Sequence, residues 1–97
     1  MYVQWVCFRF KPDINRAHFM ALIEQMVSWL QRQPGFAGYT FFDGERECAD
    51  LLRWQTRADC MAAERAFMQT ALSAQLIALV EPEVQVFFGA VALEATP

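Results

Sequence analysis

The sequence predicts an α+β domain over residues 1–97, with the element order β-α-β-β-α-β and a four-stranded antiparallel sheet. Short runs rich in aromatic and β-branched residues alternate with longer segments that have helical periodicity. The turn signal Asp43-Gly44 joins two of the strand-like runs as a hairpin. No linker or low-complexity run divides the chain, so its length corresponds to one domain.

The first half of the chain contains a strand at 2–11 and then a helix. Asp13 or Asn15 is placed to cap the helix, and Gln33-Pro34-Gly35 is placed to end it. The apolar residues of the helix recur at i, i+3, i+4, i+7 and i+11, which predicts one buried stripe. This stripe contains Phe19, Leu22, Ile23, Met26 and Leu30.

The second half is predicted to contain strands at 36–42, 47–55 and 84–93. Gly44 is expected to adopt positive φ in the hairpin. A helical region at 56–80 begins with a Thr56 cap and breaks near residues 68–70. Its expected buried rows are Ala58, Met61, Ala62 and Ala66, then Leu72, Leu76, Ile77 and Val80. This order is the ferredoxin-like arrangement, with both helical regions on one face of the sheet.

The strands are apolar on both faces, although a sheet covered on one side only should alternate apolar with polar residues. The chain is 56% hydrophobic and has no element left to cover the second face. A second copy of the chain, packed sheet against sheet, is the simplest cover. The sequence therefore predicts a homodimer.

Composition argues against several classes of partner. The net charge is −3 and no basic cluster is present, which argues against nucleic acid. No apolar run approaches the length needed to span a membrane, and no signal peptide is recognised. The spacing of Cys7, Cys48 and Cys60 fits neither a disulfide framework nor a metal site, which favours reduced thiols in a cytoplasmic protein.

Several short motifs resemble one known family. They are Lys11-Pro12 after the first strand, Pro34-Gly35-Phe36 after the helix, Tyr39 in the second strand, and Trp54-Gln55-Thr56 closing the third. Together they resemble the antibiotic biosynthesis monooxygenase family of the dimeric α/β-barrel superfamily. The resemblance implies a homodimer with a pocket between sheet and helices in each protomer. It also implies oxidation of an aromatic, quinol or polyketide-like molecule by O₂, without metal, flavin or other cofactor.

The resemblance also singles out two residues as catalytic candidates. Trp54 matches the tryptophan that lines the pocket in the family's oxygenases. Asp50 stands where the polyketide-type oxygenases have an asparagine, on the same strand face as Trp54. The haem-degrading members fit less well, because Trp5 stands at their strand-one asparagine and no histidine follows His18.

The remaining candidates have more than one interpretation. Asp50 is a general base if it is buried, or else an exposed carboxylate or a partner of Arg9 or Arg53. Arg9 and Arg53 are expected on adjacent strands, where they could bind an anionic ligand or pair with carboxylates. His18 could transfer protons, but its place off the apolar stripe favours a solvated side chain. Trp54 is either a pocket wall or a core aromatic.

Two functions are therefore compatible with the sequence. One is a cofactor-independent monooxygenase with Asp50 as base and Trp54 shaping the pocket. The alternative is a non-catalytic ligand-binding or dimerisation module of the same fold.

Overall fold

The computed structural model describes residues 1–97 and contains four strands and three helices. The strands are β1 (Tyr2–Phe8), β2 (Phe36–Asp43), β3 (Cys48–Trp54) and β4 (Gln85–Ala90). The helices are α1 (Arg16–Leu30), α2 (Arg57–Met68) and α3 (Ala71–Ile77). All strand pairs are antiparallel and the sheet order is β2-β3-β1-β4, which confirms the predicted ferredoxin-like fold.

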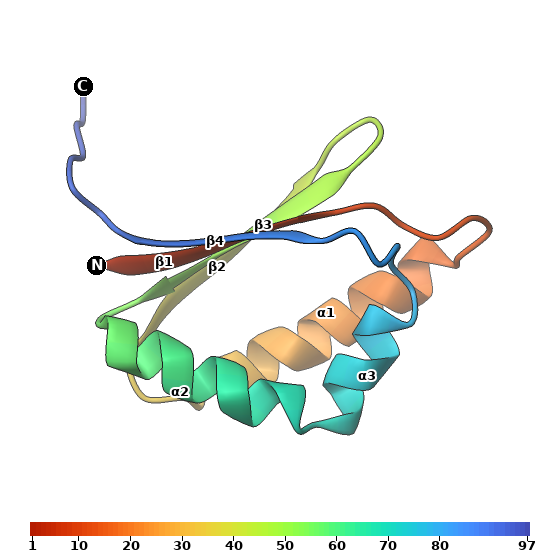
Figure 1. Cartoon of the computed structure of the whole chain (residues 1–97), viewed down its shortest axis with the longest axis horizontal. Helices are drawn as coiled ribbons and strands as arrows, with labels where there is room; N and C mark the ends of the chain where they lie inside the picture. The colour runs from red at the N-terminus through yellow and green to blue at the C-terminus, as the bar shows by residue number, and fades with distance from the viewer.

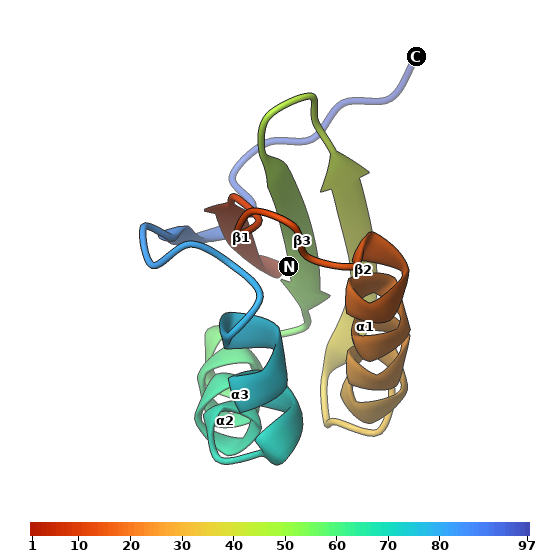
Figure 2. The ribbon, with the colours of Figure 1, turned by 90° about the vertical axis from the view of Figure 1, so that its right-hand side faces the viewer.

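The three helices lie on one face of the sheet, and no element of the chain covers the other face (Figures 1 and 2). In Figure 2, α1 lies beneath the β2 side of the sheet, and α2 and α3 lie together beneath the opposite side. The apolar core fills the space between helices and sheet. None of the helices combines the length and apolarity needed to cross a membrane.

Helix α1 forms as its sequence pattern predicts. Its five buried residues are the five of the predicted stripe. Asn15 is the N-cap, since its side-chain oxygen accepts a hydrogen bond from the His18 backbone N–H at 3.0 Å. Gly35 follows the helix with φ 76°, a left-handed conformation that a side chain disfavours.

The second helical region breaks where predicted, between α2 and α3. Thr56 and Thr70 cap the two helices by accepting bonds from Asp59 and Ser73 N–H, each at 3.1 Å. The expected buried row of α2 is wrong, because Cys60 and Ala63 are the residues turned to the core. An alanine-rich helix has apolar residues on several faces, so periodicity alone did not select the buried one.

The strand ends also differ from the prediction. β1 stops at Phe8, and beyond it only Phe10 makes an isolated bridge, to Val80. β4 covers 85–90 rather than 84–93. The hairpin does not use positive φ at Gly44, whose N–H instead donates to the Glu47 carbonyl at 3.0 Å. The connection is thus the segment 44–47, one residue later than the predicted 43–46, and it sets the register of β2 against β3.

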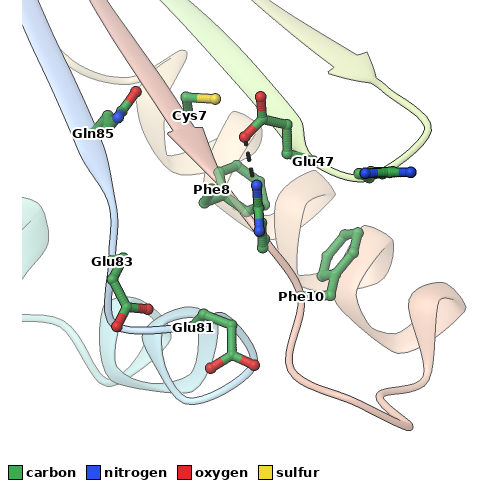
Figure 3. Close-up of a pocket in the computed structure, with 9 residues that line it drawn as sticks. Cys7, Phe8, Phe10, Glu47, Glu81, Glu83 and Gln85 are labelled. Atoms are coloured by element: carbon green, nitrogen blue, oxygen red, sulfur yellow. Dashed lines mark ion pairs between the residues drawn. The ribbon is translucent and has the colours of Figure 1, made fainter.

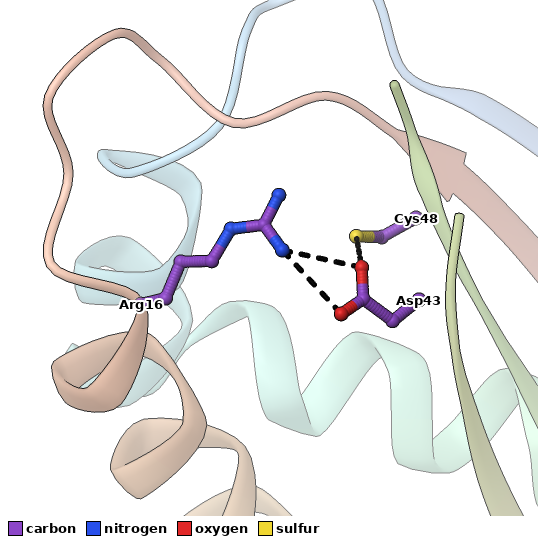
Figure 4. Close-up of polar contacts among 3 residues, drawn as sticks. All are labelled: Arg16, Asp43 and Cys48. Atoms are coloured by element: carbon purple, nitrogen blue, oxygen red, sulfur yellow. Dashed lines mark hydrogen bonds and ion pairs between the residues drawn. The ribbon is translucent and has the colours of Figure 1, made fainter. Parts of the chain in front are cut away.

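A polar contact joins the start of α1 to the end of β2 (Figure 4). Arg16 donates to the Asp43 carboxylate at 3.2 Å, and the Cys48 thiol donates to the same carboxylate at 3.6 Å. Burial makes the largest contribution to raising the pKa of Cys48, and the nearby Asp43 carboxylate raises it further. The thiol is therefore a neutral donor, and the exposed ion pair contributes little to stability.

Candidate functional site

A cleft of about 420 Å³ lies between the sheet and the helices, and all three helices contribute to its walls. We call it the central cleft. Thirteen of its 17 lining residues are hydrophobic, among them Met26 and Trp29 of α1, Phe67 of α2 and Leu76 of α3. The polar side chains along it are Gln4, Asp50, Glu64 and Ser73, and Trp54 adds an indole N–H. A mostly apolar cleft with a few polar groups is the usual form of a small-molecule site.

Asp50 lies in the middle of β3, opposite Val6 of β1 and Phe41 of β2, with its side chain toward the helices. It is only 7% exposed. Oδ2 accepts a hydrogen bond from the Tyr39 hydroxyl at 2.8 Å, whereas Oδ1 is shielded from solvent and has no hydrogen-bond partner. Burial raises the pKa of Asp50 to about 6, although the bond from Tyr39 acts to lower it. The carboxyl group therefore changes its charge close to neutral pH.

Tyr39 supports this carboxylate from the neighbouring strand β2. It is half-buried and does not line the central cleft. Burial raises the pKa of Tyr39, and the nearby Asp50 raises it further. The phenol therefore keeps its proton and acts as a hydrogen-bond donor to Asp50 across the range in which Asp50 titrates.

Trp54 ends β3 on the same face as Asp50 and is 1% exposed. Its ring meets Phe36 edge-on, with centroids 5.5 Å apart. The indole Nε1–H has no hydrogen-bond partner. Asp50 and Trp54 thus each carry one buried polar atom without a hydrogen-bond partner. Such atoms are rare in native proteins, where nearly all buried polar groups are hydrogen-bonded.

The other predicted site residues lie outside the central cleft. Arg9 and Arg53 belong to the neighbouring strands β1 and β3 or their ends, as expected, but they lie at opposite ends of that strand pair and form no common anion site. Arg9 follows the end of β1, whereas Arg53 is opposite Val3 near the start of that strand. Arg53 lies on the face away from the helices and donates to Thr40 Oγ1 at 3.0 Å. A Cβ at Gly38 would lie only 2.9 Å from the Arg53 guanidinium, so glycine makes room for this side chain.

Arg9 forms an exposed ion pair with Glu47 at 3.8 Å (Figure 3). The pair lies in a second cleft of about 510 Å³ at the end of β1, where Glu81 and Glu83 are also found. His18 is exposed in the first turn of α1 and does not line the central cleft. The interpretation of Asp50 as an exposed carboxylate or an arginine partner is wrong, because Asp50 is buried and its hydrogen-bond partner is Tyr39.

The contribution of Tyr39 was not predicted, although the sequence contains a signal for it. With 44–47 as the hairpin loop, Phe41 pairs with Asp50 and Tyr39 with Leu52. Tyr39 is then a diagonal neighbour of Asp50 on one sheet face. No group of three or more His, Cys, Asp or Glu side chains is gathered to hold a metal ion.

Comparison with solved structures shows that the fold is a known one. The chain is similar to SnoaB of Streptomyces nogalater, described as a cofactor-independent oxygenase, with TM-score 0.76 and 18% identity over 96% of this chain and 95% of that one. It is similar to an antibiotic biosynthesis monooxygenase, with TM-score 0.72 and 16% identity over all of both chains. It is also similar to a dimeric ferredoxin-like protein from an uncultured marine organism, with TM-score 0.75 and 10% identity over 99% of this chain and 91% of that one. No protein-family model and no curated protein sequence matches the chain.

Proposed function

We propose that the protein is a cofactor-independent monooxygenase that binds an aromatic phenol or quinol in the central cleft. The observation that carries this proposal is the buried Asp50 carboxyl, with Oδ1 unpartnered and a pKa of about 6 beside an apolar cleft. A base with a pKa near the working pH is suited to accept a phenolic proton. The oxygenase described among the structures of this fold is consistent with such chemistry.

In the proposed reaction, Asp50 first removes the hydroxyl proton of the substrate. The electron-rich carbon of the resulting anion then donates electrons to O₂, which forms a carbon–oxygen bond. One oxygen atom remains on the substrate as a carbonyl oxygen at the reacting C–H carbon, and the substrate's own C–O group also becomes a carbonyl. The other oxygen atom leaves as water, with the hydroxyl proton taken by Asp50 and the proton lost from that carbon. The apolar walls of the cleft exclude bulk water from the anion, and Trp54 shapes the cleft and offers its N–H to a substrate oxygen.

Oxygen consumption with a panel of hydroquinones and anthrones tests this reaction. We expect turnover by the wild type and a loss of about 100-fold or more in Asp50→Asn, which keeps the shape of the side chain but is not a base. Trp54→Phe should raise KM more than it lowers kcat. His18→Gln is the matched control, because His18 is exposed and outside the central cleft.

The alternative function, a non-catalytic ligand-binding module, predicts another result in the same samples. Trp29 and Trp54 both line the cleft, so tryptophan fluorescence reports ligand binding. Saturable quenching without oxygen consumption above background for any compound would favour the binding module over the enzyme.

We further propose that the protein works as a homodimer joined through the uncovered sheet face. Trp5, Phe42 and Phe87 are 37%, 43% and 62% exposed on that face, and the rings of Trp5 and Phe42 pack with centroids 5.5 Å apart. Such an apolar surface favours a partner. A dimeric protein of the same fold supports this assembly. Sedimentation should give twice the chain mass of 11.2 kDa at micromolar concentration, and the chain mass itself would refute it.

The cytoplasm is the proposed location. The three cysteines are all free, and two of them are buried, as is usual for a protein kept in a reducing compartment.

A further inference from the structure

We propose that Tyr39 is a positioning residue for Asp50, holding Oδ2 from outside the cleft so that proton transfer takes place at Oδ1. This inference rests on the proposed function, in which Asp50 is the base. It assigns a role to a side chain that does not line the cleft.

The two oxygens of Asp50 have different surroundings. Oδ2 is 2.8 Å from the Tyr39 hydroxyl, whereas Oδ1 has no protein partner. Asp50 lines the central cleft and also a smaller neighbouring cleft of about 140 Å³, and Tyr39 lines neither. The phenol of Tyr39 therefore approaches the carboxylate from β2, on a side that the ligand does not occupy.

This hydrogen bond fixes the orientation of the carboxylate. A free carboxylate rotates about its Cβ–Cγ bond, and its two oxygens then exchange places. A neutral donor bonded to an ionised acceptor makes a strong hydrogen bond, which opposes that rotation. Oδ1 is thereby held in one place, as the carboxylate oxygen without a protein partner that remains to accept a proton from a ligand in the cleft.

The proton balance follows from this division of roles. The O–H bond of the ligand breaks, an O–H bond forms on Oδ1, and the electron pair stays on the ligand oxygen. Tyr39 keeps its own proton throughout, because burial and the nearby Asp50 raise its pKa. Protonated Asp50 can then return the proton through the same oxygen.

Few other ionisable groups face this pair. Along the central cleft, α2 contributes Glu64, α1 and α3 contribute no charged side chain, and β1 contributes the neutral Gln4. Neither Val84 nor Val86 brings a charge from the β4 side. Glu64 is therefore the one other ionisable residue in the cleft wall. When the Tyr39 hydroxyl is removed, a change in the pKa of Asp50 reports the lost hydrogen bond in the presence of this single ionisable neighbour.

Tyr39→Phe tests the proposal, because it removes the hydroxyl and keeps the ring. The carboxyl carbon of Asp50 is followed by ¹³C NMR against pH, with its signal assigned from its absence in Asp50→Asn. We expect the pKa of Asp50 to rise above the wild-type value, since a bond to the ionised form is lost. Tyr2→Phe, at the only other tyrosine, is the matched control and should leave this pKa unchanged.

The same variant is then compared in oxygen consumption. We expect kcat to fall by about 10- to 100-fold with little change in KM, and the acid limb of the pH profile to move to higher pH. An unchanged or lower Asp50 pKa in Tyr39→Phe would overturn the proposal, as would an unchanged kcat and pH profile.

The NMR titration needs no substrate, so it separates this proposal from the proposed function. If the pKa of Asp50 rises in Tyr39→Phe but the wild type shows no turnover, the hydrogen bond from Tyr39 to Asp50 is supported and the oxygenase function is rejected.

Discussion

The two faces of the sheet differ in what they leave unsatisfied. On β3, Asp50 and Trp54 face the helices, and each leaves a buried polar atom without a partner. On the opposite face of the sheet, Arg53 of β3 donates a hydrogen bond to Thr40, but the apolar rings of Trp5 on β1 and Phe87 on β4 stay exposed. Unsatisfied polar atoms beside a cleft indicate a small ligand, whereas unsatisfied apolar area indicates a protein partner. The two faces of one sheet thus offer two different kinds of binding surface, and side-chain alternation along the strands keeps them apart.

The largest expected effect is on the outer face, with Trp5→Glu. A charge placed in the proposed interface would be buried once in each protomer, so the dimer Kd should rise by about 1,000-fold or more. Met20→Glu is the control, because Met20 on α1 has the same 37% exposure and lies away from that face. Sedimentation equilibrium measures both variants, and a Trp5→Glu protein that remains dimeric would remove the distinction between the faces.

On the inner face, Trp54→Ala should lower the free energy of unfolding by about 3–5 kcal/mol, since it removes a large buried ring. Urea unfolding at fixed protein concentration measures this change. Trp29→Ala, at a half-buried tryptophan of the same cleft, should cost less. A loss below about 1 kcal/mol for Trp54→Ala would mean that the inner face is not a packed core.

Asp50→Asn should stabilise the protein at pH 7, by about 1–3 kcal/mol. The pKa of Asp50 is raised from 3.8 to about 6, so the folded state holds this proton more tightly than the unfolded chain does. Stability from this group is therefore greatest at low pH, falls as pH rises from about 4 to about 6, and stays low above that.

In Asp50→Asn the fall in the free energy of unfolding with rising pH should be absent. Urea unfolding of the wild type and the variant at pH 4, 5, 6 and 7 measures this difference. A variant with an unaltered pH dependence would show that Asp50 is not a buried acid.

The smallest effect is expected for Arg9→Ala. Its ion pair with Glu47 is long and both side chains are exposed, so its loss should change the free energy of unfolding by less than about 1 kcal/mol. Oxygen consumption should be unchanged, because Arg9 is outside the central cleft. A large loss of turnover would show that the charged cleft of Figure 3 is part of the functional site.

Much of the fold could be predicted from the sequence, because periodicity and capping are local. The buried stripe of α1 and the break before Thr70 are examples. The buried face of α2 could not be predicted, since alanines surround Cys60 and Ala63. In the site, the shared face of Asp50 and Trp54 followed from strand alternation. The bond from Tyr39 and the separation of Arg9 from Arg53 depend on register, which the turn and the other strands set.

The turn at Gly35 has a consequence for how relatedness is judged. A side chain at this glycine would collide with the Asp59 carboxylate, and the Gly35 carbonyl accepts a bond from the Gln55 N–H at 2.8 Å. Pro34-Gly35-Phe36 and Trp54-Gln55-Thr56 are therefore two sides of one contact, although they lie far apart in the sequence. The rings of Phe36 and Trp54 also pack at this place, with centroids 5.5 Å apart, so the two motifs are coupled through side chains as well. They should be counted as a single statistical observation when ancestry is inferred, not as two independent ones.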